Sequence, residues 1–141
     1  MSEADALARR VAETLLQREG TGPAWGVAIE EAREGYARIR MKVRADMLNG
    51  HGSAHGGMIF ALADTAFAYA CNARNETTVA QSATIAFLAP AAAGDELVAE
   101  ARETSRSGRS GVYQVSVRTQ DRRAIAEFTG LSRTVGGPVI N

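Results

Sequence analysis

The stretch from His55 to Asn72 reads His-Gly-Gly-Met-Ile-Phe-Ala-Leu-Ala-Asp-Thr-Ala-Phe-Ala-Tyr-Ala-Cys-Asn. From Gly57 to Asn72 it is apolar almost all the way round a helix, and Asp64 is its only formal charge. A helix that has no polar face must be enclosed by other parts of the structure. The stretch therefore predicts a central buried helix over residues 57–72 that carries one carboxylate in its middle.

Strand-like runs lie on both sides of this helix, and a further helix is predicted over residues 2–19 with Ser2 as its N-cap. The runs cover 24–33 and 36–45 before the central helix, and about 77–88, 96–107, 110–120 and 123–134 after it. The second run alternates strictly between apolar and basic residues, as expected of an antiparallel strand with one wet face. Its apolar set is Ala37, Ile39, Met41, Val43 and Ala45. A long antiparallel sheet wrapped around one central helix, an α+β fold, is the simplest arrangement that buries the helix.

The length and composition fit a single domain over residues 1–141, with an N-terminal helix within 1–20 and a short tail at 135–141. Sixteen basic residues balance sixteen acidic ones, so no strong overall field favours nucleic acid or an anionic membrane as a partner. Cys71 is the only cysteine, which excludes an intrachain disulfide and a cysteine-cluster metal site.

The start of the chain, Met-Ser-Glu-Ala-Asp, is acidic where a secretory signal would be basic. The longest apolar stretch, Met58–Ala70, contains Asp64 and is too short to span a bilayer. We therefore expect a cytoplasmic protein.

Asp64 has two interpretations. It is either a structural carboxylate bonded to a backbone amide or a buried arginine, or a carboxylate that faces a cleft. In the second case, loss of solvent raises its basicity into a range useful for activating water. The spacing alone leaves both interpretations open.

The loop before the helix favours the second interpretation. Gly56 and Gly57 at a helix start expose backbone N–H groups at the positive end of the helix dipole, which suits an oxyanion. A glycine pair is also found in ordinary turns. His55 is either a helix cap or a group that polarises a carbonyl, and Asn49 before Gly50 is commonly a turn residue.

These residues belong to a longer pattern. It includes Met47-Leu-Asn-Gly50, His55-Gly-Gly57, Leu62-Ala-Asp-Thr-Ala-Phe-Ala-Tyr-Ala-Cys71, Thr84-Ile-Ala-Phe-Leu88, Pro90, Gly94-Asp95 and Gly111-Val-Tyr113. In order and spacing, from about residue 26 to 134, the chain resembles the phenylacetic acid degradation branch of hotdog-fold acyl-CoA thioesterases.

The resemblance implies a role for each site residue. Asp64 would act as general base on a water or as nucleophile on the thioester carbon, and the Gly56 amide would stabilise the oxyanion. His55 and Asn49 would orient the thioester and the loop. Ser82 falls where family members place a hydroxyl that helps to hold the water, although it also suits a strand as a small residue. The implied substrate is an aromatic acyl-CoA such as a hydroxylated phenylacetyl-CoA.

The chain departs from this family at Ala89, where related chains often carry Arg or Lys before a proline. Other arginines are candidates for contacts with the CoA phosphates, because a guanidinium matches phosphate oxygens. Arg106 is one of them, and the turn after it combines exposed amides with a cation. The remaining candidates are Gly108, Arg109, Ser110 and Arg133. Each arginine also suits a solvated strand edge.

We expect no metal and no bound cofactor other than the CoA of the substrate, because only two histidines are available as ligands. A serine hydrolase would need a Gly-x-Ser-x-Gly elbow, which is absent. Two alternatives remain: a hotdog dehydratase or isomerase, and a non-catalytic acyl-CoA binding module.

Geometry and resemblance also agree on a shared active site. Gly56 and Asp64 are eight residues apart, which is about 12 Å along a helix axis, and one thioester carbonyl must lie within reach of both. Two antiparallel copies of the helix about a two-fold axis bring Gly56 of one chain near Asp64 of the other. We therefore expect a homodimer with two shared sites, and by resemblance a dimer of dimers.

Overall fold

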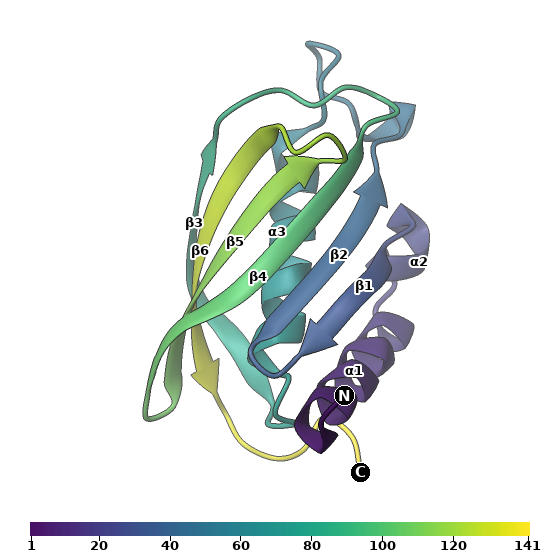
Figure 1. Ribbon diagram of the computed structural model, residues 1–141. Helices are drawn as coiled ribbons and strands as arrows, with labels where there is room; N and C mark the ends of the chain where they lie inside the picture. The colour runs from purple at the N-terminus through teal and green to yellow at the C-terminus, as the bar shows by residue number, and fades with distance from the viewer.

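Figure 1 shows the computed structural model, which describes all residues from 1 to 141. One six-stranded sheet curls around helix α3 (Gly56–Cys71). Its strands are β1 (Ala28–Arg33), β2 (Tyr36–Lys42), β3 (Thr78–Phe87), β4 (Glu96–Ser107), β5 (Ser110–Thr119) and β6 (Ala124–Thr134). They follow the order β1-β2-β4-β5-β6-β3, and every neighbouring pair is antiparallel. The predicted α+β fold, a sheet around a central helix, is confirmed.

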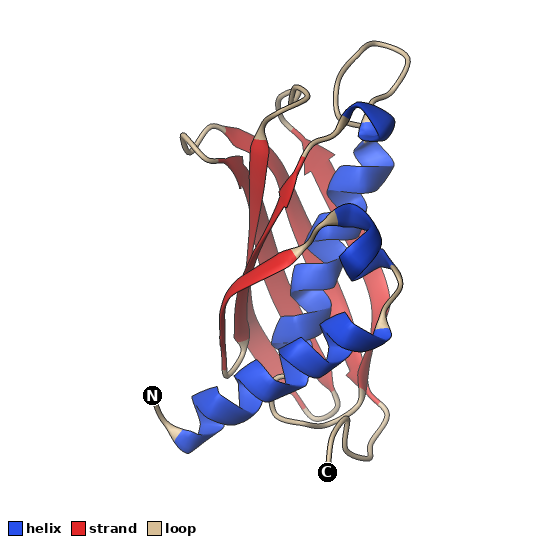
Figure 2. Cartoon of the chain, turned by 90° about the vertical axis from the view of Figure 1, so that its right-hand side faces the viewer, coloured by secondary structure: helices blue, strands red, loops and turns tan.

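The N-terminal helix α1 (Glu3–Arg18) lies beside β1 at one edge of the sheet (Figure 2). Ser2 caps it as predicted, because its hydroxyl accepts a hydrogen bond from the Asp5 N–H at 3.0 Å. The strand predicted over 24–33 is too long at its start. Residues 21–25 form a short helix, α2 (Thr21–Trp25), which ends at Gly26 with φ of +69°. A left-handed residue of this kind stops a helix, so the strand begins only at Ala28.

The strand predicted over 36–45 also ends early, at Lys42. Lys42 pairs with Glu96, the first residue of β4, and the sheet offers no strand partner beyond that point. The chain instead enters a 3₁₀ turn over Ala45–Met47. Ala45 is therefore exposed, and its predicted place on the buried face is wrong, whereas Val43 is buried.

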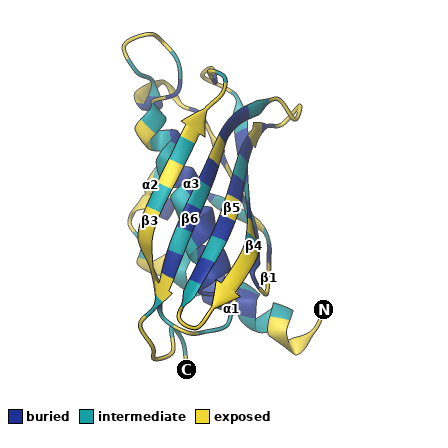
Figure 3. Ribbon diagram, turned by 90° about the vertical axis from the view of Figure 1, so that its left-hand side faces the viewer, coloured by how far each residue is buried: buried dark blue, intermediate teal, exposed yellow.

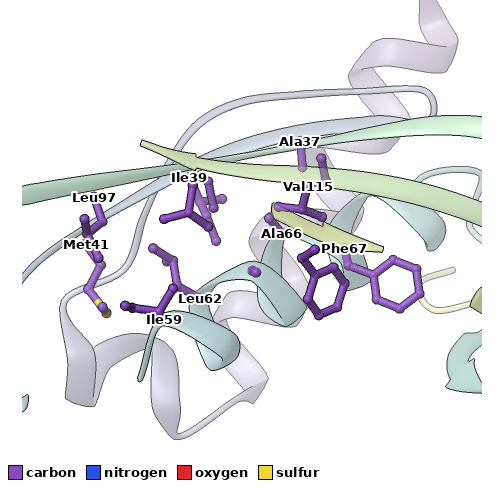
Figure 4. Close-up of a cluster of buried hydrophobic side chains, with 14 of the residues drawn as sticks. Ala37, Ile39, Met41, Ile59, Leu62, Ala66, Phe67, Leu97 and Val115 are labelled. Atoms are coloured by element: carbon purple, nitrogen blue, oxygen red, sulfur yellow. The ribbon is translucent and has the colours of Figure 1, made fainter. Parts of the chain in front are cut away.

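The core fills the space between α3 and the inner face of the sheet (Figure 4). Residues of α3 contact inward-facing residues of β2, β4 and β5. The labelled members are Ala37, Ile39, Met41, Ile59, Leu62, Ala66, Phe67, Leu97 and Val115. Phe67 also lies directly over Gly130 of β6, where an added Cβ would be 2.7 Å from its ring. This close approach holds the second half of α3 against the sheet.

The far side of α3 is not covered by this chain. Gly57 is exposed, and Ala61, Asp64 and Ala68 are only half-buried along one stripe. The neighbouring strand β3 is the uncovered edge of the sheet, and most of its residues are exposed (Figure 3). The single chain therefore covers only one side of the helix, which the sequence predicted to be enclosed. No helix of the structure has both the length and the apolar character that crossing a bilayer requires.

Candidate active site

Asp64 lies on the open stripe of α3 and is half-buried. Its carboxylate makes no side-chain hydrogen bond and no ion pair within the chain, so neither the backbone amide nor the buried arginine of the structural interpretation is present. Burial raises the pKa of the Asp64 carboxyl above its ordinary value, and no partner acts in the opposite direction. A desolvated, unpaired carboxylate is a stronger base than one in water, which suits proton abstraction.

The start of α3 supplies a free backbone donor. His55 is the N-cap, and its Nδ1 accepts a hydrogen bond from the Gly57 N–H at 2.9 Å. The N–H groups of Met58 and Ile59 donate to the His55 carbonyl. The Gly56 N–H, in contrast, donates to no acceptor in the chain. An unpaired amide at the positive end of a helix dipole is the arrangement that stabilises an oxyanion.

Gly56 lines a pocket of about 470 Å³. Gly56 and Asn49 line it together with Phe87 and Pro90. The Phe87 ring lies 3.1 Å from the place where a Cβ on Gly56 would stand, so any side chain there would push against the ring. The pocket is therefore adapted to glycine at position 56.

Asn49 shapes the loop in front of the helix. Its Oδ1 accepts hydrogen bonds from the N–H groups of His51 at 2.9 Å and Ser53 at 3.1 Å. This is the turn interpretation of Asn49. The side-chain amide nitrogen of Asn49 has no partner in the chain, and Asn49 lines the same pocket as Gly56.

Gly56 and Asp64 do not meet within one chain. Eight residues of regular α3 separate them, and Asp64 does not line the pocket at Gly56. The eight-residue separation places them about 12 Å apart along the axis. Within one chain the Gly56 amide and the Asp64 carboxylate are thus too far apart to act on the same carbonyl.

Comparison with known proteins identifies the family. A family model described as the thioesterase superfamily matches residues 51–126, which include Gly56 and Asp64. The chain belongs to the thioesterase superfamily. It is 42% identical over 128 residues to the acyl-coenzyme A thioesterase PaaI of Escherichia coli, covering 91% of either chain. The resemblance inferred from the sequence is confirmed, as is the prediction of a thioesterase enzyme.

Solved structures of thioesterase relatives confirm the hotdog fold. The structure of the E. coli PaaI protein from the phenylacetic acid degradation operon matches with a TM-score of 0.94 and 40% identity, over 96% of this chain and 99% of that chain. A point mutant of the phenylacetic acid degradation protein PaaI of Thermus thermophilus matches with a TM-score of 0.79 and 37% identity, over 83% of this chain and 100% of that one.

Ser82 lies away from the rest of this thioesterase site. It follows an irregularity in the β3–β6 pairing and stands opposite Leu131. Its neighbour Ala83 packs against the core, and successive residues of a strand point to opposite faces. The Ser82 side chain therefore points to the outer face of the sheet, where it is exposed. The structure does not bring it to Asp64, and its role in holding water stays a prediction.

The candidate CoA contacts gather at the other end of the sheet from Gly56. Gly108 and Arg109 form the β4–β5 turn, and Ser110 pairs with Arg133 of β6. Arg109 and Arg133 are exposed and make no ion pair, whereas Arg106 lies 3.8 Å from Glu103. Along β6, Arg133 is seven residues from Ala126, which pairs with Phe87 beside the Gly56 pocket, or about 23 Å at ~3.3 Å per residue. Their role in binding CoA stays a prediction.

Two residues that the sequence pattern did not indicate line a pocket beside the second half of α3. The Tyr69 hydroxyl donates a hydrogen bond to the Glu19 carboxylate, and both line an open pocket of about 500 Å³ beside the second half of α3. In the sequence, Tyr69 is one apolar residue among many and Glu19 one charge at a helix end. An aromatic hydroxyl on an otherwise apolar helix is the signal that indicates a polar partner nearby.

Proposed function

We propose that this thioesterase hydrolyses acyl-CoA thioesters to a free acid and CoA, with a hydroxylated arylacetyl group as the acyl part. The observation that carries the proposal is the pair of unpartnered groups on α3. Asp64 has a desolvated carboxylate with no partner, and Gly56 has an N–H with no acceptor. The acyl-CoA substrate is suggested by the name of the E. coli relative.

The two groups account for each step of hydrolysis. Asp64 takes a proton from a water, and the water oxygen forms a bond to the thioester carbon. The carbonyl oxygen becomes an oxyanion, which the Gly56 N–H stabilises. When the tetrahedral centre collapses, the carbon–sulfur bond breaks and the CoA sulfur takes the proton from Asp64. No cofactor and no metal is needed for this sequence, because a carboxylate and an amide supply all of it.

Asp64 has a second route as a nucleophile that forms an anhydride with the acyl group before water attacks. Single turnover in water enriched with the heavy oxygen isotope tests the nucleophilic route, which label in the Asp64 carboxylate would establish. A general base leaves the carboxylate of Asp64 unlabelled, whereas hydrolysis of an anhydride at the enzyme carbonyl would label it. The Asp64 peptide is then weighed by mass spectrometry.

The site is completed by a second copy of the chain. The stripe on α3 that this chain leaves open and the unpaired edge strand β3 lie side by side. Val79 of β3, which is 48% exposed, and Leu88 just beyond the strand, which is 58% exposed, add apolar area there. A two-fold axis at this edge covers the stripe and brings Gly56 of one protomer to Asp64 of its partner. By resemblance, these dimers pair into tetramers.

Contacts with CoA complete the proposal. We assign the phosphate contacts to the Gly108–Ser110 turn and Arg133, whose guanidinium and amide groups face solvent without ion-pair partners. His55, which caps α3, and Asn49, which holds the loop before it, would orient the thioester and the loop. The turn would bind the CoA phosphates, and the Gly56 pocket would receive the thioester carbonyl.

Release of free thiol from a panel of acyl-CoAs tests the function. The panel contains acetyl-, octanoyl-, phenylacetyl- and hydroxyphenylacetyl-CoA, and we expect the highest kcat/KM for the last. Binding of these compounds without release of thiol would instead indicate a binding module. A change in the acyl group without release of thiol would indicate a dehydratase or an isomerase.

A further inference from the structure

The pocket beside the second half of α3, here called the tail pocket, has a volume of about 500 Å³. Its walls come from the end of α1, from α3, from the start of β3 and from the C-terminal tail. Leu15, Ala68, Pro138 and Val139 supply the apolar lining. A space of this size, with apolar walls and a few polar groups, is typical of a small-molecule site.

The tail pocket begins one helical turn beyond the candidate base. Ala68 follows Asp64 by four residues, so the two lie on the same face of α3 about 6 Å apart along its axis. Both belong to the open stripe of the helix. An acyl group whose carbonyl carbon lies at Asp64 therefore has the tail pocket directly ahead of it.

A carboxylate lies at the polar side of the tail pocket. Glu19 accepts hydrogen bonds from the Tyr69 hydroxyl and, at 3.3 Å, from the Thr21 hydroxyl, and it makes no ion pair. Burial and the nearby Glu19 carboxylate raise the pKa of the Tyr69 hydroxyl well above its usual value, so Tyr69 stays a neutral donor. An ionised carboxylate has about four acceptor positions. Glu19 thus retains room for one more donor.

The tail forms a fixed wall of this pocket. Asn75 Oδ1 accepts hydrogen bonds from the N–H groups of Val139 at 2.9 Å and Ile140 at 2.8 Å. An Arg18 guanidinium nitrogen donates to the Val139 carbonyl at 3.1 Å. Residues 138–140 are therefore held in place by side chains from two other parts of the chain, and the shape of the pocket depends on them.

We infer that the tail pocket is the acyl subsite, and that Glu19, held by Tyr69, selects acyl groups that carry a hydroxyl at their far end. The apolar walls take the body of the acyl group, and its hydroxyl donates a hydrogen bond to Glu19. This inference rests on the proposed function, because it assigns the substrate selectivity of the same site.

The test compares kcat/KM for hydroxyphenylacetyl-CoA with kcat/KM for phenylacetyl-CoA. In Glu19→Gln we expect the ratio between them to fall about tenfold, because a hydrogen bond to a neutral acceptor replaces one to a charged acceptor. Tyr69→Phe, which frees Glu19 to move, should lower the same ratio. A wild type with a higher kcat/KM for phenylacetyl-CoA than for hydroxyphenylacetyl-CoA would overturn the inference.

Matched controls make the same chemical changes elsewhere. Glu13→Gln alters an exposed carboxylate on the same helix, and Tyr36→Phe removes a hydroxyl bonded to a carboxylate on the other face of the sheet. Both should keep the wild-type ratio, and melting curves report whether each variant is folded.

A second variant tests occupancy of the tail pocket without touching Glu19 or Tyr69. Ala68→Leu narrows the entrance, so it should raise KM for both arylacetyl substrates about tenfold or more while acetyl-CoA is little affected. An equal effect on acetyl-CoA would contradict the acyl subsite. If the wild type releases no thiol from any acyl-CoA, the proposed function fails. If the wild type releases thiol but the Glu19 and Tyr69 variants keep its ratio of kcat/KM between the two arylacetyl substrates, only the selectivity role of Glu19 fails.

Discussion

The imidazole of His55 and the backbone of Gly57 are joined by a hydrogen bond of 2.9 Å, in which Nδ1 accepts from the N–H. In this bond Nδ1 is the acceptor and the Gly57 N–H is the donor. This hydrogen bond occupies the second N–H group of α3, at Gly57, while the first, at Gly56, has no acceptor. The cap therefore determines which amide is available to a substrate.

Substitution of His55 should separate its role as a cap from a role in chemistry. His55→Ala should lower the free energy of unfolding by about 1 kcal/mol, as loss of an N-cap typically does. His55→Asn, which restores a capping oxygen, should recover most of that stability and most of kcat. Urea unfolding and thiol release are the two measurements. A variant that is as stable as the wild type but inactive would show that the imidazole itself polarises the substrate.

Removal of the Asp64 charge should strongly lower kcat without harm to the fold. Asp64→Asn should lower kcat roughly a hundredfold or more, because a positioned base is lost. A folded variant with near-normal turnover would make Asp64 a structural residue. The matched change Asp46→Asn, at an exposed carboxylate in the loop before the site, should leave kcat unchanged.

The pH dependence follows from the raised pKa of Asp64. Only the ionised carboxylate acts as a base, so kcat/KM should fall as pH falls through this pKa, above the ordinary range of an aspartate. Because the pKa of Asp64 is raised in the folded chain, protonation of Asp64 stabilises the fold. This stabilisation is lost as pH rises through the folded-state pKa. Asp64→Asn should therefore melt at a higher temperature than the wild type at neutral pH. The difference should vanish well below the usual aspartate pKa.

Complementation tests the site shared between protomers. Asp64→Asn and Gly56→Pro, each inactive alone, are refolded together in equal amounts. Random pairing makes half of the dimers mixed, and each mixed dimer has one intact site of two, so about a quarter of wild-type sites should return. Differently tagged chains verify that mixed dimers form. If they form and no activity returns, the site is not shared.

Arg109 tests the assignment of the phosphate contacts. Arg109→Ala should raise KM for an acyl-CoA about tenfold, as expected when a charge-assisted hydrogen bond is lost. A pantetheine thioester that lacks the nucleotide should be unaffected. Arg10→Ala, at an exposed arginine of α1 without an ion pair, serves as the control. Equal effects on both thioesters would rule out the phosphate role.

The local pattern of residues was sufficient to predict the central helix and the six strands, because periodicity reports which face of an element is buried. It also singled out Asp64, since a lone charge in an apolar helix needs an explanation. It failed where an element depends on its neighbours. Ala45 continues the alternation of β2 but is exposed, because the partner strand begins only at Glu96.

The amino-acid sequence by itself determined the family, the buried helix and the identity of the candidate base. Only the tertiary structure decided that Asp64 lacks a partner, that Ser82 points outward, and that Glu19 meets Tyr69 across fifty residues. The physical reason is that the hydrophobic pattern reports only which face of each local helix or strand is buried. Which polar groups meet is decided by strand pairing and helix packing between segments that are distant in sequence.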